Sequence, residues 1–172
     1  MEERLRKIKW IMLDVDGTLT DGGIQVSNSG EYTKKFHVRD GFGIVEAKKE
    51  GLKFAIITGR QTEIIRIRLQ EELKIDEVHQ GVKNKLEVLG MLKKRHQIAT
   101  DEILYMGDDV NDLAVLGYVG ILACPHNSVQ EIIEVSDIKA EAIGGEGAVR
   151  EIIEKVMKAQ GKWENVIKRY RP

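Results

Sequence analysis

The sequence predicts an α/β fold with a mainly parallel sheet and helices on both faces. Short apolar runs alternate with longer amphipathic runs along the chain, which is typical of strands that alternate with helices. A length of 172 residues suits one compact core. The composition, 42% hydrophobic and 32% charged, is that of an ordinary soluble domain. Together these observations favour a Rossmann-like three-layer sandwich.

Six strands and six helices are expected from the apolar patterns. The expected strands are Ile8 to Leu13, Lys53 to Ile57, Glu77 to Val78, Glu102 to Met106, Tyr118 to Leu122 and a weaker one near Asp137 and Ile138. The expected helices are Gly43 to Glu50, Thr62 to Leu73, Lys83 to Arg95, Asp109 to Leu116, Val129 to Glu134 and Gly147 to Ala159.

One segment after the first strand departs from this alternation. Ile24 to Ser27 and Glu31 to Val38 flank an Asn-Ser-Gly turn, which predicts a β-hairpin over about residues 22–38. A lone hairpin is marginally stable, so we expect it to pack on the domain or on another subunit. Residues 1–160 then form one domain, and residues 161–172 a C-terminal tail that is either loose or docked on a neighbour.

Charge and cysteine content restrict the classes of function. A formal net charge of −1 gives no electrostatic reason to bind nucleic acid or a membrane surface. Cys124 is the single cysteine, so no intramolecular disulfide is possible, which favours a cytoplasmic protein. The apolar run after Lys9 is too short for a signal-peptide core or a membrane span of roughly 20 residues.

The first expected strand leads into Asp14-Val15-Asp16-Gly17-Thr18. In an extended chain Asp14 and Asp16 project to the same side. The carboxyl end of a parallel strand is where open α/β sheets bind ligands. Gly17 permits a tight turn whose backbone N–H groups can face a phosphate, and Thr18 belongs to the same expected substrate-binding turn. A bare pair of aspartates could instead form an Asx turn that ends the strand.

Two further segments are expected at the same edge of the sheet. Thr58, Gly59 and Arg60 follow the second strand, where a hydroxyl, a backbone N–H and a cation could bind phosphate oxygens. Thr58 alone could equally be a helix N-cap. Lys85 follows a glycine turn at the start of a helix; it could pair with phosphate and a nucleophilic carboxylate, or be an ordinary surface lysine.

An acidic cluster follows the strand that ends at Met106. Asp108, Asp109, Asn111 and Asp112 bring hard oxygen ligands together, and clustered carboxylates with bound water suit Mg²⁺. Alternatively, Asp109 could cap the next helix and Asp112 could be solvated. Which of these two would contact a metal is left open by the sequence.

In order and spacing, these four segments resemble the signature motifs of the haloacid dehalogenase superfamily. The resemblance implies an Mg²⁺-dependent phosphatase with Asp14 as nucleophile, Asp16 as general acid and base, and Thr58 and Lys85 as further catalytic residues. It also implies that Asp14, the backbone carbonyl of Asp16, and Asp108 bind the metal. Neither gap that usually carries a cap domain is long enough for one here, so we expect a capless, open site.

Within this superfamily the chain is similar to the capless phosphatases of 3-deoxy-D-manno-octulosonate 8-phosphate, which serve lipopolysaccharide precursor synthesis. The similar segments are DGTLTDGGI, VRDGFGI, TGR, QG..NK, GDDVND and GGEGAVRE. The resemblance implies a homotetramer, a small phosphorylated sugar acid as substrate, and Arg60 and Arg68 as substrate-binding residues. Arg150 could bind the sugar-acid carboxylate or simply form an ion pair on its helix. Arg68 could likewise lie on a solvated helix face.

Two other functions remain open from the sequence. Related phosphatases act on nine-carbon sialic-type acid phosphates or other small phosphomonoesters, although they tend to carry an acid where this chain has Arg60. A non-enzymatic receiver domain also combines acidic residues, Thr, Lys and Mg²⁺. Receivers, however, place their acidic pair on the first strand and the phosphorylated Asp on a later one, and they lack DxDGT. Here the two-apart pair comes first, and the second acidic cluster comes after Lys85.

Overall fold

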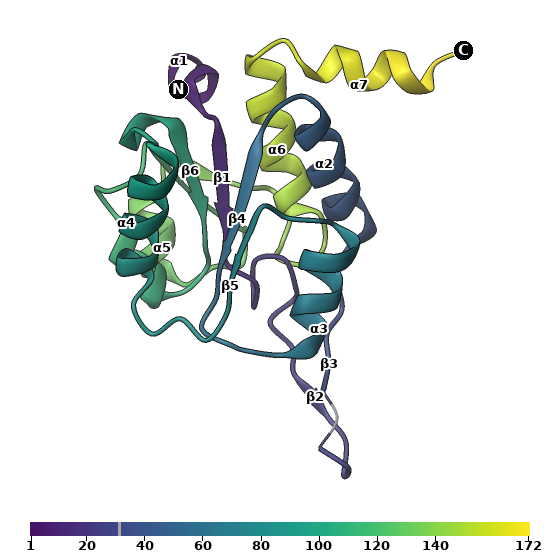
Figure 1. Cartoon of the computed structure of the whole chain (residues 1–172), viewed down its shortest axis with the longest axis vertical. Helices are drawn as coiled ribbons and strands as arrows, with labels where there is room; N and C mark the ends of the chain where they lie inside the picture. The colour runs from purple at the N-terminus through teal and green to yellow at the C-terminus, as the bar shows by residue number, and fades with distance from the viewer. Residues whose placement is uncertain (31) are drawn as a thin grey trace.

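The structure, a computed structural model, describes residues 1–30 and 32–172 of the chain. Its centre is a six-stranded sheet in the order β5-β4-β1-β6-β7-β8, and every pair of neighbouring strands is parallel. Figure 1 shows helices on both faces of this sheet, so the predicted three-layer α/β fold is confirmed. The strands are β1 Trp10–Leu13, β4 Lys53–Ile57, β5 Glu77–His79, β6 Ile103–Met106, β7 Ile121–Cys124 and β8 Ile138–Lys139.

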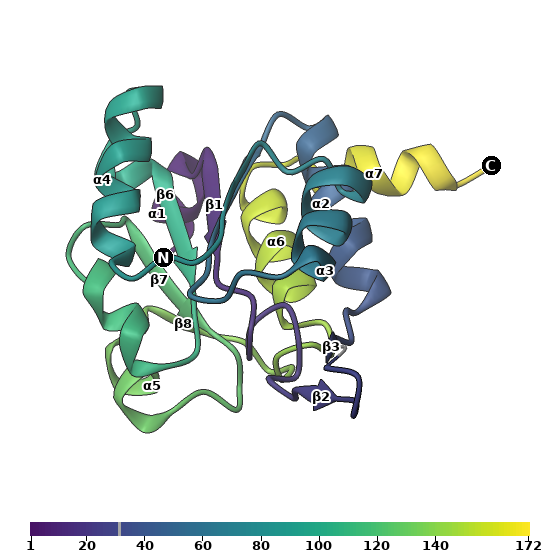
Figure 2. The ribbon, with the colours of Figure 1, turned by 60° about the horizontal axis from the view of Figure 1, so that its bottom comes forward.

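The helices divide into two layers, which Figure 2 separates clearly. α2, α3 and α6 cover one face of the sheet, and α4 and α5 cover the other. The helical segments are α1 Glu2–Lys7, α2 Val38–Lys49, α3 Glu63–Ile65, its π-helical continuation η1 Arg66–Glu72, α4 Lys85–His96, α5 Gln130–Val135, α6 Ala148–Ala159, α7 Trp163–Tyr170, and the 3₁₀ segments η2 Thr100–Glu102 and η3 Val110–Val115.

The central strand β1 explains why the functional edge is well defined. All four of its residues are buried, because apolar side chains on both sides of the strand pack against the two helical layers. In the parallel ladders Leu13 lies opposite Ile56 of β4 and Met106 of β6. The loops that follow these three strands therefore leave the sheet at the same level, and they carry three of the four predicted motifs.

Two predicted element starts moved furthest, because tertiary packing overrides local propensity. α2 begins at Val38 and not at Gly43, although the segment contains two glycines. These glycines let the helix approach its neighbours: a Cβ on Gly43 would lie 2.9 Å from Arg150 Cδ on α6. β7 begins at Ile121, since the chain turns at Gly117, which has a φ of 80°, and only then enters the sheet.

The predicted hairpin is present as two short antiparallel strands, β2 Gln25–Val26 and β3 Tyr32–Thr33. Gly30, in the predicted turn, has a φ of 80°, a conformation that favours glycine. The predicted second strand is shorter than expected, because Val38 belongs to α2; its first residue, Glu31, lies outside the described residues. Figure 1 shows the hairpin projecting from the domain.

Two helices at the chain ends were not predicted. The last segment forms α7, whose Trp163 and Val166 are buried against the core. Arg169 of α7 forms ion pairs with Glu46 and Glu50, which anchors the helix to its own chain. Residues 163–170 are therefore neither loose nor dependent on a neighbour for docking, because they pack on the chain's own domain.

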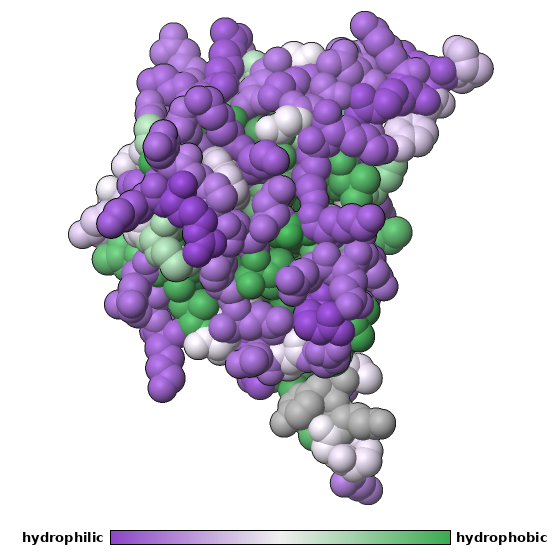
Figure 3. All heavy atoms as spheres, in the orientation of Figure 1, coloured by the Kyte–Doolittle hydropathy of each residue, from purple (hydrophilic) through white to green (hydrophobic). Residues whose placement is uncertain are grey.

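The view of Figure 3 shows a mainly hydrophilic surface over the domain. Within the described residues, the structure contains no helix that is both long and apolar enough to span a membrane.

Candidate active site

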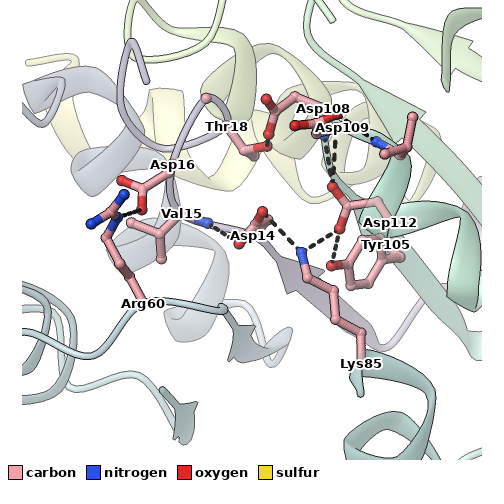
Figure 4. Close-up of polar contacts among 12 residues, drawn as sticks. Asp14, Val15, Asp16, Thr18, Arg60, Lys85, Tyr105, Asp108, Asp109 and Asp112 are labelled. Atoms are coloured by element: carbon pink, nitrogen blue, oxygen red, sulfur yellow. Dashed lines mark hydrogen bonds and ion pairs between the residues drawn. The ribbon is translucent and has the colours of Figure 1, made fainter. Parts of the chain in front are cut away.

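Asp14 follows the central strand and lies at the bottom of a pocket with a volume of about 320 Å³. Its side chain is nearly buried, with 5% of the residue exposed. The backbone N–H of Val15 donates to Asp14 Oδ1 at 2.7 Å, and Lys85 Nζ lies 2.9 Å from Oδ2. The carboxylate is therefore held in one orientation, as Figure 4 shows. The pocket is lined by Asp14, Asp16, Thr58, Gly59, Arg60, Asp109 and Asn111.

Lys85 is a buried residue and not a surface lysine. It begins α4, where Asn84 caps the helix by accepting a hydrogen bond from the N–H of Glu87. Only 4% of its side chain is exposed, and its ammonium contacts both Asp14 and Asp112. Burial disfavours its charge, but the attraction of Asp14 and Asp112 outweighs burial and raises the Lys85 pKa. Lys85 is thus a cation fixed beside the candidate nucleophile.

Asp112 accepts four hydrogen bonds and organises this side of the site. Its Oδ1 accepts from Lys85 Nζ at 2.5 Å and from the Tyr105 hydroxyl at 2.6 Å. Its Oδ2 accepts from the backbone N–H groups of Asp108 at 3.0 Å and Asp109 at 3.3 Å. A carboxylate has about four lone-pair positions. We call Lys85, Tyr105 and Asp112 the Asp112 network.

Asp108 lies between the Asp112 network and the turn that follows β1. Thr18, fully buried, donates its hydroxyl to Asp108 Oδ1 at 3.1 Å. Gly17 has a φ of 86°, and a Cβ there would lie 2.0 Å from Asp108 Oδ2. Gly17 and Thr18 were predicted to bind substrate. Their contacts in the structure orient Asp108: Gly17 leaves room for its carboxylate, and Thr18 holds one of its oxygens.

Asp14, Asp108 and Asp112 each offer an oxygen within 4.8 Å of the others, a spacing that could hold a metal ion. Burial, followed by repulsion from Asp14 and Asp112, raises the pKa of Asp108 to about 7. Burial also raises the pKa of Asp14, against the attraction of Lys85. Ionised carboxylates this close together repel each other, and a bound divalent cation offsets that repulsion. This set of oxygen ligands therefore fits Mg²⁺.

Asp16 forms the opposite, more open side of the pocket. Lys34 Nζ donates to Asp16 Oδ1, and Arg60 Nε lies 3.4 Å from Oδ2. In the view of Figure 4, Asp14 lies between the pair formed by Asp16 and Arg60 and the Asp112 network. Side-chain exposure is 25% for Asp16 and 45% for Arg60, so this group borders solvent. We call Asp16, Arg60 and Lys34 the Asp16 group.

Thr58 and Gly59 line the pocket as predicted, and the following helix begins at Glu63, one residue after its predicted start. The N-cap of α3 is Thr62, whose hydroxyl accepts from the N–H of Ile65 at 3.3 Å. The capping alternative for Thr58 therefore does not hold. Thr58 is 1% exposed as a residue and stays at the end of β4, beside Asp14 and Asp16 in the pocket lining.

The glycine-rich segment near α6 packs directly on the turn after β1. The N–H of Gly145 donates to the Thr18 carbonyl at 3.2 Å. A Cβ on Gly144 would lie 1.8 Å from the Gly17 carbonyl oxygen, so only glycine allows this approach. This contact supports the shape of the turn that carries Asp16.

Two predicted substrate-binding arginines lie away from the pocket in this chain. Arg68, on η1, pairs with Glu72 at 2.7 Å and approaches Gly41 of α2. Arg150 pairs with Glu154 at 2.7 Å and stacks on the rings of Phe42 and Trp163. Arg150 therefore forms an ion pair on its own helix, which was one of the two alternatives. Its guanidinium contacts Glu154 and the two aromatic rings.

Asp109 caps η3: its own N–H donates to Asp112, and its Oδ1 accepts from the N–H of Val110 at 2.7 Å. Asp109 lines the pocket but is not part of the three-carboxylate cluster. Asp112 was expected to be solvated or to bind metal; it is fully buried.

Sequence reasoning missed three residues of the site. Tyr105 reads as an ordinary core residue of β6, and only its contact with Asp112 distinguishes it. Lys34 lies in the hairpin with no motif around it. Asn111 was noted as part of the acidic cluster, but its place in the pocket lining was not foreseen.

Comparisons with known proteins agree with this geometry. A family model described as haloacid dehalogenase-like hydrolase matches residues 74–152. The chain is 38% identical over 159 residues to the 3-deoxy-D-manno-octulosonate 8-phosphate phosphatase KdsC of Escherichia coli K12, covering 92% of this chain and 84% of that protein. The corresponding protein of Yersinia pestis is 33% identical over 162 residues, covering 94% and 86%.

Solved structures give the same result. The Moraxella catarrhalis 3-deoxy-D-manno-octulosonate 8-phosphate phosphatase, in complex with magnesium, phosphate and a KDO molecule, has a TM-score of 0.95 and 36% identity, covering 99% of this chain and 97% of that one. The cobalt-bound Haemophilus influenzae enzyme has a TM-score of 0.88 and 33% identity, covering 92% of each chain. The chain therefore belongs to the haloacid dehalogenase-like hydrolases, in the family of the 3-deoxy-D-manno-octulosonate 8-phosphate phosphatases.

Proposed function

We propose that the protein hydrolyses 3-deoxy-D-manno-octulosonate 8-phosphate to the free sugar acid and phosphate, a step in lipopolysaccharide precursor synthesis. The observation that carries this proposal is the buried Asp14 carboxylate, held 2.9 Å from Lys85 at the end of the central strand. The identity of 38% to an enzyme of that name supports the substrate. Arg60 in the pocket also supports it over nine-carbon acids, because those phosphatases tend to carry an acid at this position.

In the first half-reaction an Asp14 oxygen attacks phosphorus and the bond to the sugar oxygen breaks. Asp16, two residues along and facing the same pocket, gives its proton to the leaving oxygen. Lys85, the Thr58 hydroxyl and the Gly59 N–H hold the phosphoryl oxygens, so that charge developing on them is stabilised. The products are free sugar acid and a phosphorylated Asp14.

In the second half-reaction water attacks the phosphorus of the aspartyl-phosphate. Asp16, now ionised, takes a proton from that water, and the bond to Asp14 breaks. Phosphate leaves, Asp14 is again a carboxylate and Asp16 is again protonated. The same two side chains thus complete both halves, in agreement with their places in one pocket.

Asp14, Asp108 and the backbone carbonyl of Asp16 would hold Mg²⁺, which neutralises negative charge around the phosphoryl group when bound. The sequence also predicts Asp109 and Asp112 as possible metal ligands. The four hydrogen bonds of Asp112 support a positioning role for it, because Lys85 and the backbone of Asp108 depend on them. Thr18 then holds Asp108 from the other side.

The pocket is open, and we propose that a cytoplasmic homotetramer completes it. Within the described residues no cap domain is inserted. The projecting hairpin and the start of the helix that follows it expose apolar side chains: Ile24 is 42% exposed, Val26 58% and, at the start of α2, Val38 75%. Apolar surface on a projecting hairpin favours association with other copies. Arg68, which does not reach the pocket of its own chain, would then be available to a neighbour.

Phosphate release tests the function directly. The protein is assayed with the eight-carbon acid phosphate, a nine-carbon acid phosphate and simple phosphate esters, with and without Mg²⁺. We expect Mg²⁺-dependent release, fastest with the eight-carbon substrate, and a loss of at least about 10⁴-fold in Asp14→Asn. Asp101→Asn, an exposed aspartate paired with Lys7, is the matched control and should retain full activity. Release that persists in Asp14→Asn would contradict the proposal. Sedimentation analysis tests the tetramer.

A further inference from the structure

Lys34 is a buried cation in an otherwise exposed hairpin. Only 3% of its side chain is exposed, whereas the side chain of the next residue, Lys35, is 61% exposed. The two lysines also have different partners: Lys34 contacts Asp16 in the active site, and Lys35 pairs with Glu146 at the surface. The sequence gives no reason for this difference, so it follows from where the hairpin lies.

The backbone around Lys34 is fixed at two points. Before it, Thr33 pairs with Gln25 across the hairpin, and the Thr33 hydroxyl donates to the Gln25 side chain at 3.0 Å. After it, Phe36 forms an antiparallel bridge with Thr20, four residues beyond Asp16. The returning hairpin strand therefore runs along the turn that follows β1. Its position delivers the Lys34 ammonium to Asp16.

The Lys34 ammonium has donors left for a second anion. A lysine ammonium carries three N–H donors. Within the described part of the chain, the ammonium of Lys34 donates a hydrogen bond to Asp16 Oδ1. Arg60, on the other oxygen of Asp16, borders the pocket and is 45% exposed. The Asp16 group thus presents two cations around one carboxylate, an arrangement that favours a further negative charge nearby.

The reaction geometry decides which part of the substrate meets these cations. The phosphoryl group must lie at Asp14, where Lys85 and Thr58 are available. Asp16 has to reach the leaving oxygen, so the remainder of the substrate extends from the phosphoryl group past Asp16. The only strong anion in that remainder is the carboxylate of the sugar acid. A lysine beside Asp16 is therefore on the leaving-group side.

We propose that Lys34 binds the carboxylate of the substrate's leaving group, together with Arg60, while it keeps its contact with Asp16. This inference rests on the proposed function and names a substrate-binding residue that no motif contains. It makes the hairpin part of the binding site of its own chain. Specificity for an acidic sugar then depends on a residue outside the motifs.

The test measures how tightly the two reaction products inhibit the enzyme separately. Inhibition constants for 3-deoxy-D-manno-octulosonate and for inorganic phosphate are determined in Lys34→Met, which keeps the aliphatic stem, and in Lys34→Gln. We expect the constant for the sugar acid to rise roughly ten- to a hundredfold, because a hydrogen bond between charged groups is lost. The constant for phosphate should change less than about twofold, since phosphate binds at Asp14 and Lys85.

Kinetics with two substrates separate binding from an indirect effect on Asp16. Glucose 6-phosphate has an alkyl leaving group that also needs an acid but carries no carboxylate. An effect through Asp16 would lower kcat/KM equally for both substrates, whereas the proposal expects a selective loss for the sugar-acid phosphate. Lys34→Arg should recover most of this loss, and Lys35→Met is the matched control without effect.

Failure of the proposed function and failure of the role of Lys34 give different results. If wild-type protein releases no phosphate from any ester, the proposed function fails. If wild-type protein is active but the Lys34 variants bind the sugar acid as tightly as it does, only the inference fails. A parallel rise in both inhibition constants would also overturn it, because Lys34 would then serve the phosphoryl site. Thermal unfolding of each variant verifies that the hairpin change leaves the domain folded.

Discussion

The two sides of Asp14 are built differently. The Asp112 network is buried, and each of its members has a fixed partner. In the Asp16 group, Asp16 and Arg60 border solvent, whereas the Lys34 side chain is buried. The two cations of the group come from separate segments, the loop after β4 and the hairpin. Phosphoryl transfer is the same for every phosphomonoester and needs rigidly placed side chains. Recognition of a particular leaving group needs side chains that the substrate can reach and that can differ between enzymes. The difference between the two sides matches that division.

Removing one cation from each side should give the largest contrast. Lys85→Met leaves the two buried carboxylates of Asp14 and Asp112 without their ammonium. We expect kcat to fall by roughly 10³-fold or more, because stabilisation of developing charge is lost. Arg60→Met, on the exposed side, should cost about tenfold, mainly in KM. Steady-state kinetics at saturating Mg²⁺ measure both. Equal losses in the two variants would remove the distinction between the sides.

Lys85→Arg serves as the charge-conserving control for the first variant. Thermal unfolding with Mg²⁺ present shows whether Lys85→Met is folded. If its transition is lost, Lys85→Arg carries the comparison, because a longer guanidinium in the same buried site should also misplace Asp14 and lower kcat.

Alanine variants at Gly17 and Gly51 distinguish the effect of backbone strain from the effect of crowding at Asp108. Both have a positive φ, 86° and 88°, but a Cβ on Gly17 would collide with Asp108 and one on Gly51 meets nothing within 4 Å. Both alanine variants should lose about 1–2 kcal/mol of unfolding free energy through backbone strain. Only Gly17→Ala should also need a higher Mg²⁺ concentration for half-maximal activity, by roughly tenfold or more. An unchanged Mg²⁺ requirement would show that Asp108 does not bind the metal.

Tyr105→Phe tests whether the Asp112 network positions Lys85. The variant removes one of four donors to a buried carboxylate, so we expect a loss of about 1–3 kcal/mol in unfolding free energy. A misplaced Lys85 should lower kcat several-fold and leave KM unchanged. Tyr118→Phe, at a residue 50% exposed, is the matched control for removing a phenol. Normal kcat in a destabilised Tyr105→Phe would assign Tyr105 to folding alone.

The stability of the metal-free protein should depend on Asp108 and pH. Burial, then repulsion from Asp14 and Asp112, raises the pKa of Asp108 from 3.8 to about 7. The folded state therefore holds a proton that the unfolded state has lost, and its stability falls as pH rises from about 4 to 7. Asp108→Asn should raise Tm without metal more at pH 8 than at pH 5. A constant difference across this range, measured by calorimetry in chelator, would contradict the assignment.

The parts of the site that were predictable are those at strand ends. Asp14, Thr58 and Lys85 could be placed together because parallel strands end at one edge, and the structure gathers them in one site. Lys34 could not, since its proximity to Asp16 depends on how the hairpin folds back. Tyr105 could not either, because an apolar strand gives no sign that one hydroxyl will meet a carboxylate.

The errors in the fold have a similar physical cause. The helix was predicted to begin at Gly43, but it begins at Val38, and Gly43 permits close contact between α2 and α6. For Arg150 the sequence left open an anion ligand or an ion pair on its own helix. It could not indicate the contacts with Phe42 and Trp163, because neither is local in sequence. Short-range patterns thus predict which element forms and miss contacts between distant elements.

The position of β1 has a consequence for how the protein is made. This strand is synthesised first among those of the sheet, yet its neighbours β4 and β6 end only at Ile57 and Met106. At roughly 5–20 residues per second, the apolar strand waits several seconds on the ribosome before both its edges can be covered. Gly145, which contacts the turn after β1, is translated later still. A nascent chain therefore exposes an apolar, unpaired strand early. It can form the complete active site only near the end of translation.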